Sequence, residues 1–275
     1  MIKIFLTVRN RLAITKKCIQ ALKEHSTIKH RLYVYDNATN FLLDEHFKYF
    51  YKLFSKKLIS QVTFTSEEST FNAFSKAATC NFFGKQHEED PNKDTYNFLV
   101  MLDNDIIVTP GWDMKLHEAW KFVAKKKLTE IKIIGQLPGG IKYKTQTYDI
   151  GGMKGAVGKL GGSGLWSARP NFFRDIGYLD LSKLVGYDKR HDQNYWQAMD
   201  KATRGKSYIM GLNQKLGIHC GKQAGSVCNQ LSRNRGQKDK AEKIKFVKAE
   251  ENISNLDFKT FYNIIYNDKK LLNDW

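Results

Sequence analysis

The chain has 275 residues, a length that suits one large domain or one domain with an extension. Its 45 Lys and Arg against 28 Asp and Glu give a formal net charge of +17. A charge of this size favours a polyanionic partner or an anionic surface, although a lysine-rich proteome with generally basic surfaces is the alternative. No apolar run approaches the length of a membrane span, and Ile2–Val8 is too short for a signal-peptide core. We therefore expect a cytoplasmic protein, located in the host cytoplasm if the chain is virus-encoded.

The four cysteines include no CxxC pair, which is typical of reduced thiols in a cytoplasmic protein. A zinc site would also lack the usual close ligand spacing, since its nearest candidates are His191, His219, Cys220 and Cys228.

Strand-like and helix-like segments alternate along the first half of the chain. Apolar and β-branched runs predict strands at residues 2–8, 31–35, 61–65, 98–102 and 131–135. Apolar residues at helical spacing predict helices at 12–25, 41–58, 69–83 and 112–126, with a polar loop at 87–94. This order predicts an α/β fold with a doubly wound, mostly parallel sheet that binds ligands beyond the carboxyl ends of its strands.

The strongest chemical signal lies at residues 97–110, where Asp103, Asn104 and Asp105 interrupt an apolar run. Two carboxylates inside a sheet would repel each other and would cost several kcal/mol each to desolvate. They become favourable if the strand ends at Leu102 and the pair binds Mg²⁺ or Mn²⁺ in a cleft. An Asp-Asn turn between two strands is the alternative.

Residues 139–164 are rich in glycine but do not form a P-loop. Met153 occupies the first glycine position of that motif, and Leu160 follows Lys159 in place of Ser or Thr. We expect hairpins there, and a loop that a sugar or a backbone can approach closely. A strand at 165–169 and a short helix at 172–176 are expected to follow.

The second half of the chain ends in a basic segment. Lys and Arg are frequent between residues 229 and 248, and apolar spacing returns from Ile253 onward. This pattern predicts a basic, helical C-terminal extension rather than a disordered tail.

Several segments occur in the order found in glycosyltransferases of the GT-A fold. They are IKIFLTVRNR, VYDNAT, FLVMLDNDI, GGSGLWSARPNFFRDIGYLD and HDQNYW, followed by the His-containing segment GIHCGKQAGS. Over residues 1–228 the chain resembles these enzymes, most closely the inverting family 2 group. The resemblance implies a Rossmann-like catalytic domain at 1–228, with residues 229–275 as the extension.

The resemblance also implies a donor site. The nucleotide would be bound by Thr7, Arg9, Asn10, Asp36, Asn37 and Asp103. A divalent cation, Mn²⁺ or Mg²⁺, would be held by Asp103, Asp105 and His219 and would bridge the phosphates of a nucleotide sugar, UDP-linked as in UDP-glucose. The alternatives are an Asx turn with Asn37 for Asp36, and for His219 a diphosphate contact or a place in the core.

For the acceptor side, the resemblance implies that Asp192 is the general base that takes the proton of the attacking hydroxyl. Asp188 is the rival, and a helix amino-terminal carboxylate is the alternative for either residue. Contacts with the sugar or acceptor are expected from Asn104, Gly162, Ser163, Trp166, Tyr195 and Trp196, of which Trp196 can equally belong to the core.

Together these features predict a metal-dependent inverting hexosyltransferase that uses a nucleotide sugar. Hydroxymethylated bases in DNA are the favoured acceptor, because basic residues are spread through the chain and no amphipathic membrane helix stands out. Arg233, Arg235 and Lys238 are expected to contact DNA phosphates. The alternatives are transfer to cell-envelope or lipid-linked glycans at an anionic membrane, and a non-catalytic nucleic-acid-binding protein. No protein partner is inferred.

Overall fold

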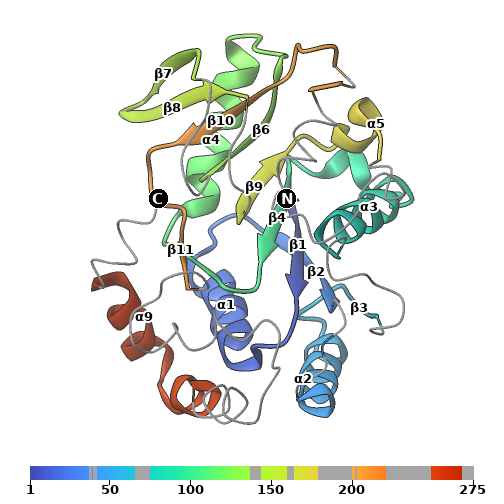
Figure 1. Ribbon diagram of the computed structural model, residues 1–275, viewed down its shortest axis with the longest axis vertical. Coiled ribbons are helices and arrows are strands. Elements are labelled where there is room, and N and C mark those ends of the chain that lie inside the picture. The colour runs from blue at the N-terminus through green and yellow to red at the C-terminus, as the bar shows by residue number, and fades with distance from the viewer. Residues whose placement is uncertain are drawn as a thin grey trace.

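The computed structural model describes residues 1–36, 39, 42–65, 75–136, 144–159, 164–178, 200–201, 203–220 and 249–267. Within these residues, one large sheet has the strand order β3-β2-β1-β4-β9-β6-β10-β8-β7, and a small second sheet pairs β11 with β5. Figure 1 shows α3 and α5 on one side of the large sheet and α1 and α4 on the other. The α/β class that the sequence predicts is confirmed.

One half of the large sheet is parallel. It contains β1 (Ile2–Val8), β2 (His30–Asp36), β3 (Gln61–Phe64) and β4 (Leu99–Asp103). Thr7 lies opposite Asp103 in the register of β1 and β4, and Val8 lies opposite Asp36 in that of β1 and β2. Because the carboxyl ends of parallel strands meet at one edge, Thr7, Asp36 and Asp103 share that edge, as expected from the sequence.

The other half of the sheet is formed by β6 (Ile131–Gln136), β7 (Gln146–Ile150), β8 (Met153–Gly158), β9 (Leu165–Ala168) and β10 (Tyr208–Leu212). Strand β9 lies antiparallel between β4 and β6, whereas β10 runs parallel to β6. Strands β7 and β8 form a hairpin that turns at Gly151 and Gly152, whose φ angles of +62° and +87° favour glycine. A hairpin in the glycine-rich stretch is therefore confirmed.

Alternate residues along each strand pack into two cores, one on either face of the sheet. On β1, Ile4 and Leu6 belong to the first core, and Phe5 belongs to the second. The first core is covered by α1 (Leu12–His25), α2 (Leu43–Ser55), α4 (Trp112–Lys125) and α9 (Phe258–Asn267), and the second by α3 (Ser75–Glu88) and α5 (Phe172–Ile176). The result is a three-layer fold with helices on both sides of the sheet.

Helix α3 continues to Glu88, so the polar loop that we expected from residue 87 is wrong at its start. Tertiary contacts near its end explain why the helix ends later than expected. The ring of Phe83 stacks on Phe5 with centroids 4.4 Å apart, and His87 Nε2 lies 2.8 Å from the carbonyl oxygen of Pro170. The two residues in each contact lie far apart in sequence, so the polarity of residues 87–94 did not reveal where the helix ends.

Residues 249–267 pack into the first core. Ile253, Phe258, Phe261 and Ile265 are almost fully buried there, next to α1. Lys17 Nζ on α1 also donates a hydrogen bond to the carbonyl oxygen of Leu256. The basic segment with Arg233, Arg235 and Lys238, and the domain boundary expected at residue 228, lie outside the described residues, so both stay predictions.

Candidate active site

The turn between β1 and α1 begins the site. Asn10 and Arg11 both have left-handed backbone conformations, with φ angles of 51° and 58°, which residues other than glycine rarely adopt. Hydrogen bonds hold this turn: Asn10 N donates to Thr39 Oγ1 at 2.9 Å, and Thr15 N and Oγ1 donate to the carbonyl oxygen of Arg11 at 3.0 and 2.8 Å. The side chain of Arg11 therefore starts from a fixed position at the amino end of α1.

Asn104, the middle residue of the Asp-Asn-Asp sequence, ties this turn to β4. Its backbone nitrogen donates to the carbonyl oxygen of Thr7 at 3.1 Å. Its side-chain Nδ2 donates to the carbonyl oxygen of Asn10 at 3.3 Å and to Thr15 Oγ1 at 2.8 Å. The structure thus assigns the amide nitrogen a holding role, and the sugar contact expected for Asn104 stays a prediction.

Asp105 lies at the centre of a buried cluster. Its Oδ2 atom is 2.5 Å from Arg11 Nη1 and 3.4 Å from His219 Nε2, and the three side chains are only 8%, 10% and 13% exposed in that order. Burial by itself would raise the pKa of Asp105, but His219 and Arg11 together hold the pKa far below its usual range. The carboxylate is therefore ionised in the folded protein.

The small second sheet brings His219 to Asp105. Strand β11 (Gly217–His219) pairs antiparallel with β5 (Ile106–Val108), and His219 lies opposite Ile106. Cys220 N donates to the carbonyl oxygen of Asp105 at 2.7 Å. A Cβ atom on Gly217 would lie 2.6 Å from Cγ2 of Ile106, so glycine permits this close approach. The proximity expected from the late His-containing segment is thus present.

The donor atoms of Asp105 and His219 suit a divalent cation. Carboxylate oxygen and imidazole nitrogen both bind Mn²⁺, and such sites usually leave positions for water and substrate phosphate. Among the described residues, however, no group of three His, Cys, Asp or Glu side chains is close enough to hold a metal ion. Asp103 therefore does not form a single cluster with Asp105 and His219. Asp105 and His219 would thus supply two ligands to a cation, and its remaining ligands would have to come from elsewhere.

Asp36 lies at the same edge of the sheet but is only 1% exposed. Its Oδ1 accepts a hydrogen bond from Thr39 N at 3.0 Å, and its Oδ2 is 3.2 Å from Nδ1 of His46 on α2. The carboxylate thus takes part in a local hydrogen bond with residue 39, whereas the alternative stated for it, an Asx turn with Asn37, lies outside the described residues. Its contact with a nucleotide stays a prediction, as do those of Thr7 and Arg9.

The expected acceptor contact of Trp166 is wrong. The residue is 2% exposed and lies in the second core, where its ring packs against Phe172 with centroids 5.8 Å apart. A buried ring leaves no face on which a sugar could stack. Other predicted residues lie outside the described ones and stay predictions: Asn37, Gly162, Ser163, Asp188, Asp192, Tyr195 and Trp196.

Two residues of the site were not predicted from the sequence. One is Arg11, although a second arginine directly before an expected helix was a usable signal. The other is Glu250, whose Oε2 accepts a hydrogen bond from Ala13 N at 2.7 Å in the first turn of α1. Burial raises the pKa of Glu250. No local pattern could have revealed this contact, because the two residues are 237 positions apart.

No protein-family model and no curated protein sequence matches the chain. Solved structures do match. Mannosyltransferase PcManGT from Pyrobaculum calidifontis, in complex with GDP-Man and Mn²⁺, has a TM-score of 0.51 at 10% identity, over 92% of this chain and 69% of that chain. GalNAc-T7, with UDP, GalNAc and Mn²⁺, has a TM-score of 0.52 at 12% identity, over 98% and 57%.

TarS from S. aureus also matches, with a TM-score of 0.47 at 12% identity, over 98% of this chain and 46% of that chain. The chain thus spans less than half of TarS and little more than half of GalNAc-T7. The likeness to PcManGT and GalNAc-T7 shows the GT-A fold, which is the fold of nucleotide-sugar glycosyltransferases. The fold implied by the sequence resemblance is confirmed.

Proposed function

We propose that the protein is a metal-dependent inverting glycosyltransferase that moves a sugar from a nucleotide diphosphate to a hydroxyl acceptor. The observation that carries this proposal is the cluster of Asp105, His219 and Arg11 beyond the carboxyl ends of β1 and β4. It combines an ionised carboxylate and an imidazole with a guanidinium suited to phosphate. The fold supports the proposal, because PcManGT and GalNAc-T7 were both solved with Mn²⁺ and with a nucleotide sugar or its parts.

Each residue would have a distinct role. Asp105 and His219 would hold the cation, which would stabilise the charge that develops on the leaving diphosphate. Asp192 would accept the proton of the acceptor hydroxyl as this oxygen attacks the anomeric carbon. In-line displacement inverts the configuration of that carbon.

A donor screen tests the proposal. The purified protein is heated with UDP-glucose, UDP-GlcNAc, UDP-GalNAc or GDP-mannose in the presence of Mn²⁺, Mg²⁺ or EDTA, and donor hydrolysis is measured in parallel. We expect one donor to raise the melting temperature and to be hydrolysed only when a cation is present. Full turnover in EDTA would contradict the metal requirement, and the absence of any donor effect would contradict the activity.

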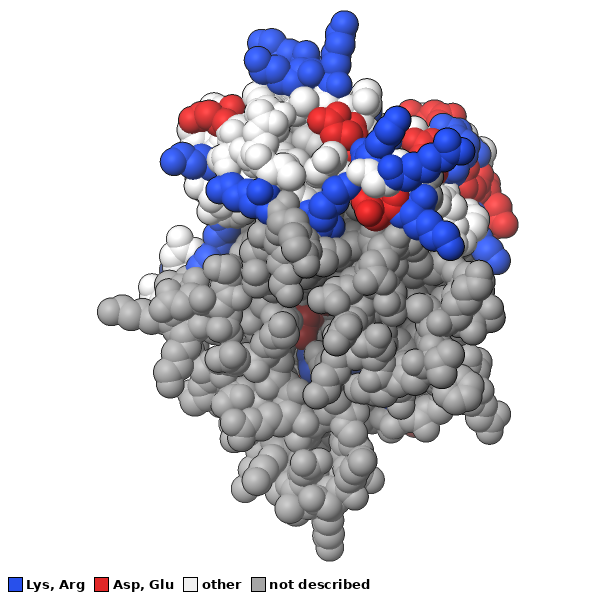
Figure 2. Space-filling view, turned by 45° about the horizontal axis from the view of Figure 1, so that its top comes forward, with Lys and Arg blue, Asp and Glu red and all other residues white. Residues whose placement is uncertain are grey.

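For the acceptor we propose hydroxymethylated bases in duplex DNA, which the net charge of +17 supports. Figure 2 shows several Lys and Arg side chains on the described part of this face, with Asp and Glu side chains among them. The exposed residues Lys125, Lys126 and Lys127 lie where α4 ends. The described part of the chain therefore offers a basic group besides Arg233, Arg235 and Lys238.

The two basic groups can be compared by titrating DNA binding with salt. The logarithm of affinity should fall linearly with the logarithm of salt concentration, by about 0.9 per neutralised phosphate. Alanine at Arg233, Arg235 and Lys238, or at Lys125–Lys127, should flatten the slope if that group contacts DNA, and should weaken binding to all sequences alike. Transfer should require a hydroxymethylated duplex, whose base must leave the stack. Binding that does not respond to salt would contradict DNA as the acceptor.

The exposed surface of helix α2 supports a second class of acceptor. An apolar stripe along its surface is about half exposed, formed by Leu43 (50%), Phe47 (54%), Tyr51 (63%), Phe54 (48%) and the following Leu58 (55%). The exposed Lys48 and Lys52 lie beside it. Exposed aromatic rings next to lysines suit an anionic membrane surface. The sequence led us to expect that no amphipathic membrane helix stands out, and the half-exposed apolar face of α2 is the observation that supports the membrane alternative. No described helix is long and apolar enough to cross a membrane.

Vesicle sedimentation separates the two acceptor classes. The membrane class predicts binding to anionic but not to neutral vesicles, and loss of this binding in the double variant Phe47→Ser, Phe54→Ser. If DNA also fails as an acceptor, this result would support a lipid-linked or envelope glycan. The matched control is Phe122→Ser, an aromatic change on the distant helix α4. DNA binding without turnover of any donor would instead support the non-catalytic nucleic-acid-binding alternative.

A further inference from the structure

Arg11 is paired with a carboxylate oxygen of Asp105 to which a cation would bind. Its Nη1 lies 2.5 Å from Oδ2 of Asp105, and both side chains are at least nine-tenths buried. The Nε2 atom of His219 approaches the same oxygen at 3.4 Å. Asp105, one of the two side chains that suit a metal ion, is thus already paired with a positive group from the turn after β1.

The backbone beneath Arg11 is fixed, whereas its contact with Asp105 is made by the far end of a long side chain. Thr15 and Asn104 hold the turn by hydrogen bonds, and Glu250 accepts a further hydrogen bond from Ala13 N. The guanidinium can therefore change its partner by side-chain rotation, without rearrangement of the turn.

Electrostatics favours such an exchange when a donor enters. A divalent cation bound to Oδ2 of Asp105 would repel a guanidinium at hydrogen-bonding distance from the same oxygen. A nucleotide diphosphate brings negative oxygens to which the planar guanidinium can donate two parallel hydrogen bonds. The cation and the diphosphate therefore each favour the state in which Arg11 has left Asp105.

We propose that Arg11 closes the donor site before binding by holding Asp105, and that it moves to the diphosphate when the cation takes its place. The inference rests on the proposed function and adds a binding residue and a coupling to it. Because coupling between two ligands is reciprocal, the cation must strengthen nucleotide binding by the same factor as the nucleotide strengthens cation binding.

Isothermal titration calorimetry tests this coupling without any turnover. Mn²⁺ is titrated alone and with saturating UDP, and UDP is titrated with and without Mn²⁺, with GDP in parallel. In the wild type we expect Mn²⁺ to bind at least about tenfold more tightly when the nucleotide is present. In Arg11→Gln we expect Mn²⁺ alone to bind about tenfold more tightly than in the wild type, the nucleotide to bind about tenfold more weakly, and most of the coupling to be lost.

Two further variants complete the experiment. Arg31→Gln makes the same chemical change at an exposed arginine whose Nη1 lies 3.4 Å from Tyr96 Oη, and it should behave as the wild type. Arg11→Lys keeps the charge without the planar fork, and it should retain part of the coupling even if Arg11→Gln unfolds.

The outcomes distinguish the inference from the proposed function. If Mn²⁺ alone binds equally well to the wild type and to Arg11→Gln, or if the variant retains full coupling, the inference is wrong while the function stands. If Mn²⁺, UDP and GDP all fail to bind the wild type, the proposed function fails and the inference fails with it.

Discussion

Two buried ion pairs near opposite ends of β1 differ in the residues that surround them. Near the amino end, Lys3 Nζ lies 2.7 Å from Oδ2 of Asp90. Beyond the carboxyl end, Arg11 Nη1 lies 2.5 Å from Oδ2 of Asp105. Both pairs join a basic side chain to a carboxylate in the protein interior, so burial and charge alone do not distinguish a structural pair from a functional one.

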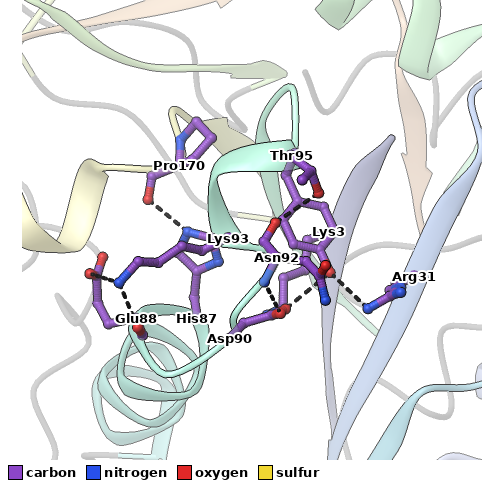
Figure 3. A network of polar contacts seen from close by, with 10 residues as sticks. Lys3, Arg31, His87, Glu88, Asp90, Asn92, Lys93, Thr95 and Pro170 are labelled. Atoms are coloured by element: carbon purple, nitrogen blue, oxygen red, sulfur yellow. Dashed lines mark hydrogen bonds and ion pairs between the residues drawn. The ribbon is translucent and has the colours of Figure 1, made fainter.

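The pair near the amino end is enclosed by the protein itself. Tyr96 Oη and Asn92 N donate to the Asp90 carboxylate at 3.0 and 2.9 Å, and the ammonium of Lys3 lies 4.4 Å from the centre of the Tyr33 ring. Figure 3 shows Lys3 and Asn92 beside Asp90, next to the contact of His87 with Pro170. The polar groups of this network are paired with one another, so the network supports the fold.

The pair beyond the carboxyl end has different neighbouring residues. Oδ2 of Asp105 is shared by Arg11 and His219, which are residue types that bind phosphate and metal ions respectively. The pair also lies at the edge where open α/β sheets bind their ligands. The neighbours of each ion pair, together with the end of the strand at which it lies, distinguish the pair for which we propose a function from the pair that supports the fold.

The largest effect on stability is expected from Lys3→Met. This change leaves Asp90 buried without its cation, which should lower the free energy of unfolding by about 3–5 kcal/mol. Urea denaturation measures the change, and donor affinity of the folded variant should stay as in the wild type. The control is Lys93→Met, whose partly exposed pair with Glu88 spans 3.4 Å and should contribute about 1 kcal/mol or less. Equal losses in the two variants would contradict the comparison.

A smaller effect, on turnover rather than stability, is expected from Asp192→Asn. Loss of a positioned base should lower turnover roughly a hundredfold while donor affinity and the unfolding midpoint stay unchanged. Steady-state kinetics and denaturation together check this result, with Asp188→Asn as the matched variant. If Asp188→Asn is the inactive protein instead, the base has been assigned to the wrong carboxylate.

The smallest effect is a dependence of stability on acid pH that comes from Asp90. Burial by itself would raise the pKa of this residue, but Lys3, Asn92 and Tyr96 lower it to about 2 in the folded protein. Because the folded pKa lies below the unfolded value of about 3.9, the stabilisation is complete above pH 4 and disappears as the pH falls toward 2. The shift alone corresponds to about 2.6 kcal/mol, and solvent screening of this partly exposed group should reduce it to about 1–2 kcal/mol in urea titrations. Asp90→Asn should lack this component, and an unchanged acid slope in that variant would contradict the assignment.

Much of the fold could be predicted from the sequence because the signals are local. Helical spacing places α1 at Leu12–His25, and the break after the apolar run locates the end of β4 at the Asp-Asn-Asp sequence. What the sequence did not reveal depends on contacts between distant segments. Helix α3 ends later than expected, and His87 in its last turn lies 2.8 Å from the carbonyl oxygen of Pro170, a residue far away in sequence. Likewise, Trp166 belongs to the core because β9 lies between β4 and β6.

The candidate site shows the same division. The Asp-Asn-Asp sequence and the late histidine were visible as motifs, and the structure brings Asp105 and His219 together. The role of Arg11 depends on a side chain reaching across the turn to Asp105, 94 positions away in sequence. The support that Glu250 provides to α1 likewise requires the C-terminal residues to pack on the first core. Neither contact follows from spacing along the chain.

The most direct test of the central claim is donor binding by Asp105→Asn. The melting temperatures of the wild type and the variant are compared with UDP or GDP in the presence of Mn²⁺ and in EDTA, after circular dichroism has shown that the variant is folded. We predict that the nucleotide stabilises the wild type only with Mn²⁺, that this shift disappears in the variant, and that turnover falls roughly a thousandfold. An equal Mn²⁺-dependent shift and equal turnover in Asp105→Asn would contradict the assignment of Asp105 to the donor's cation.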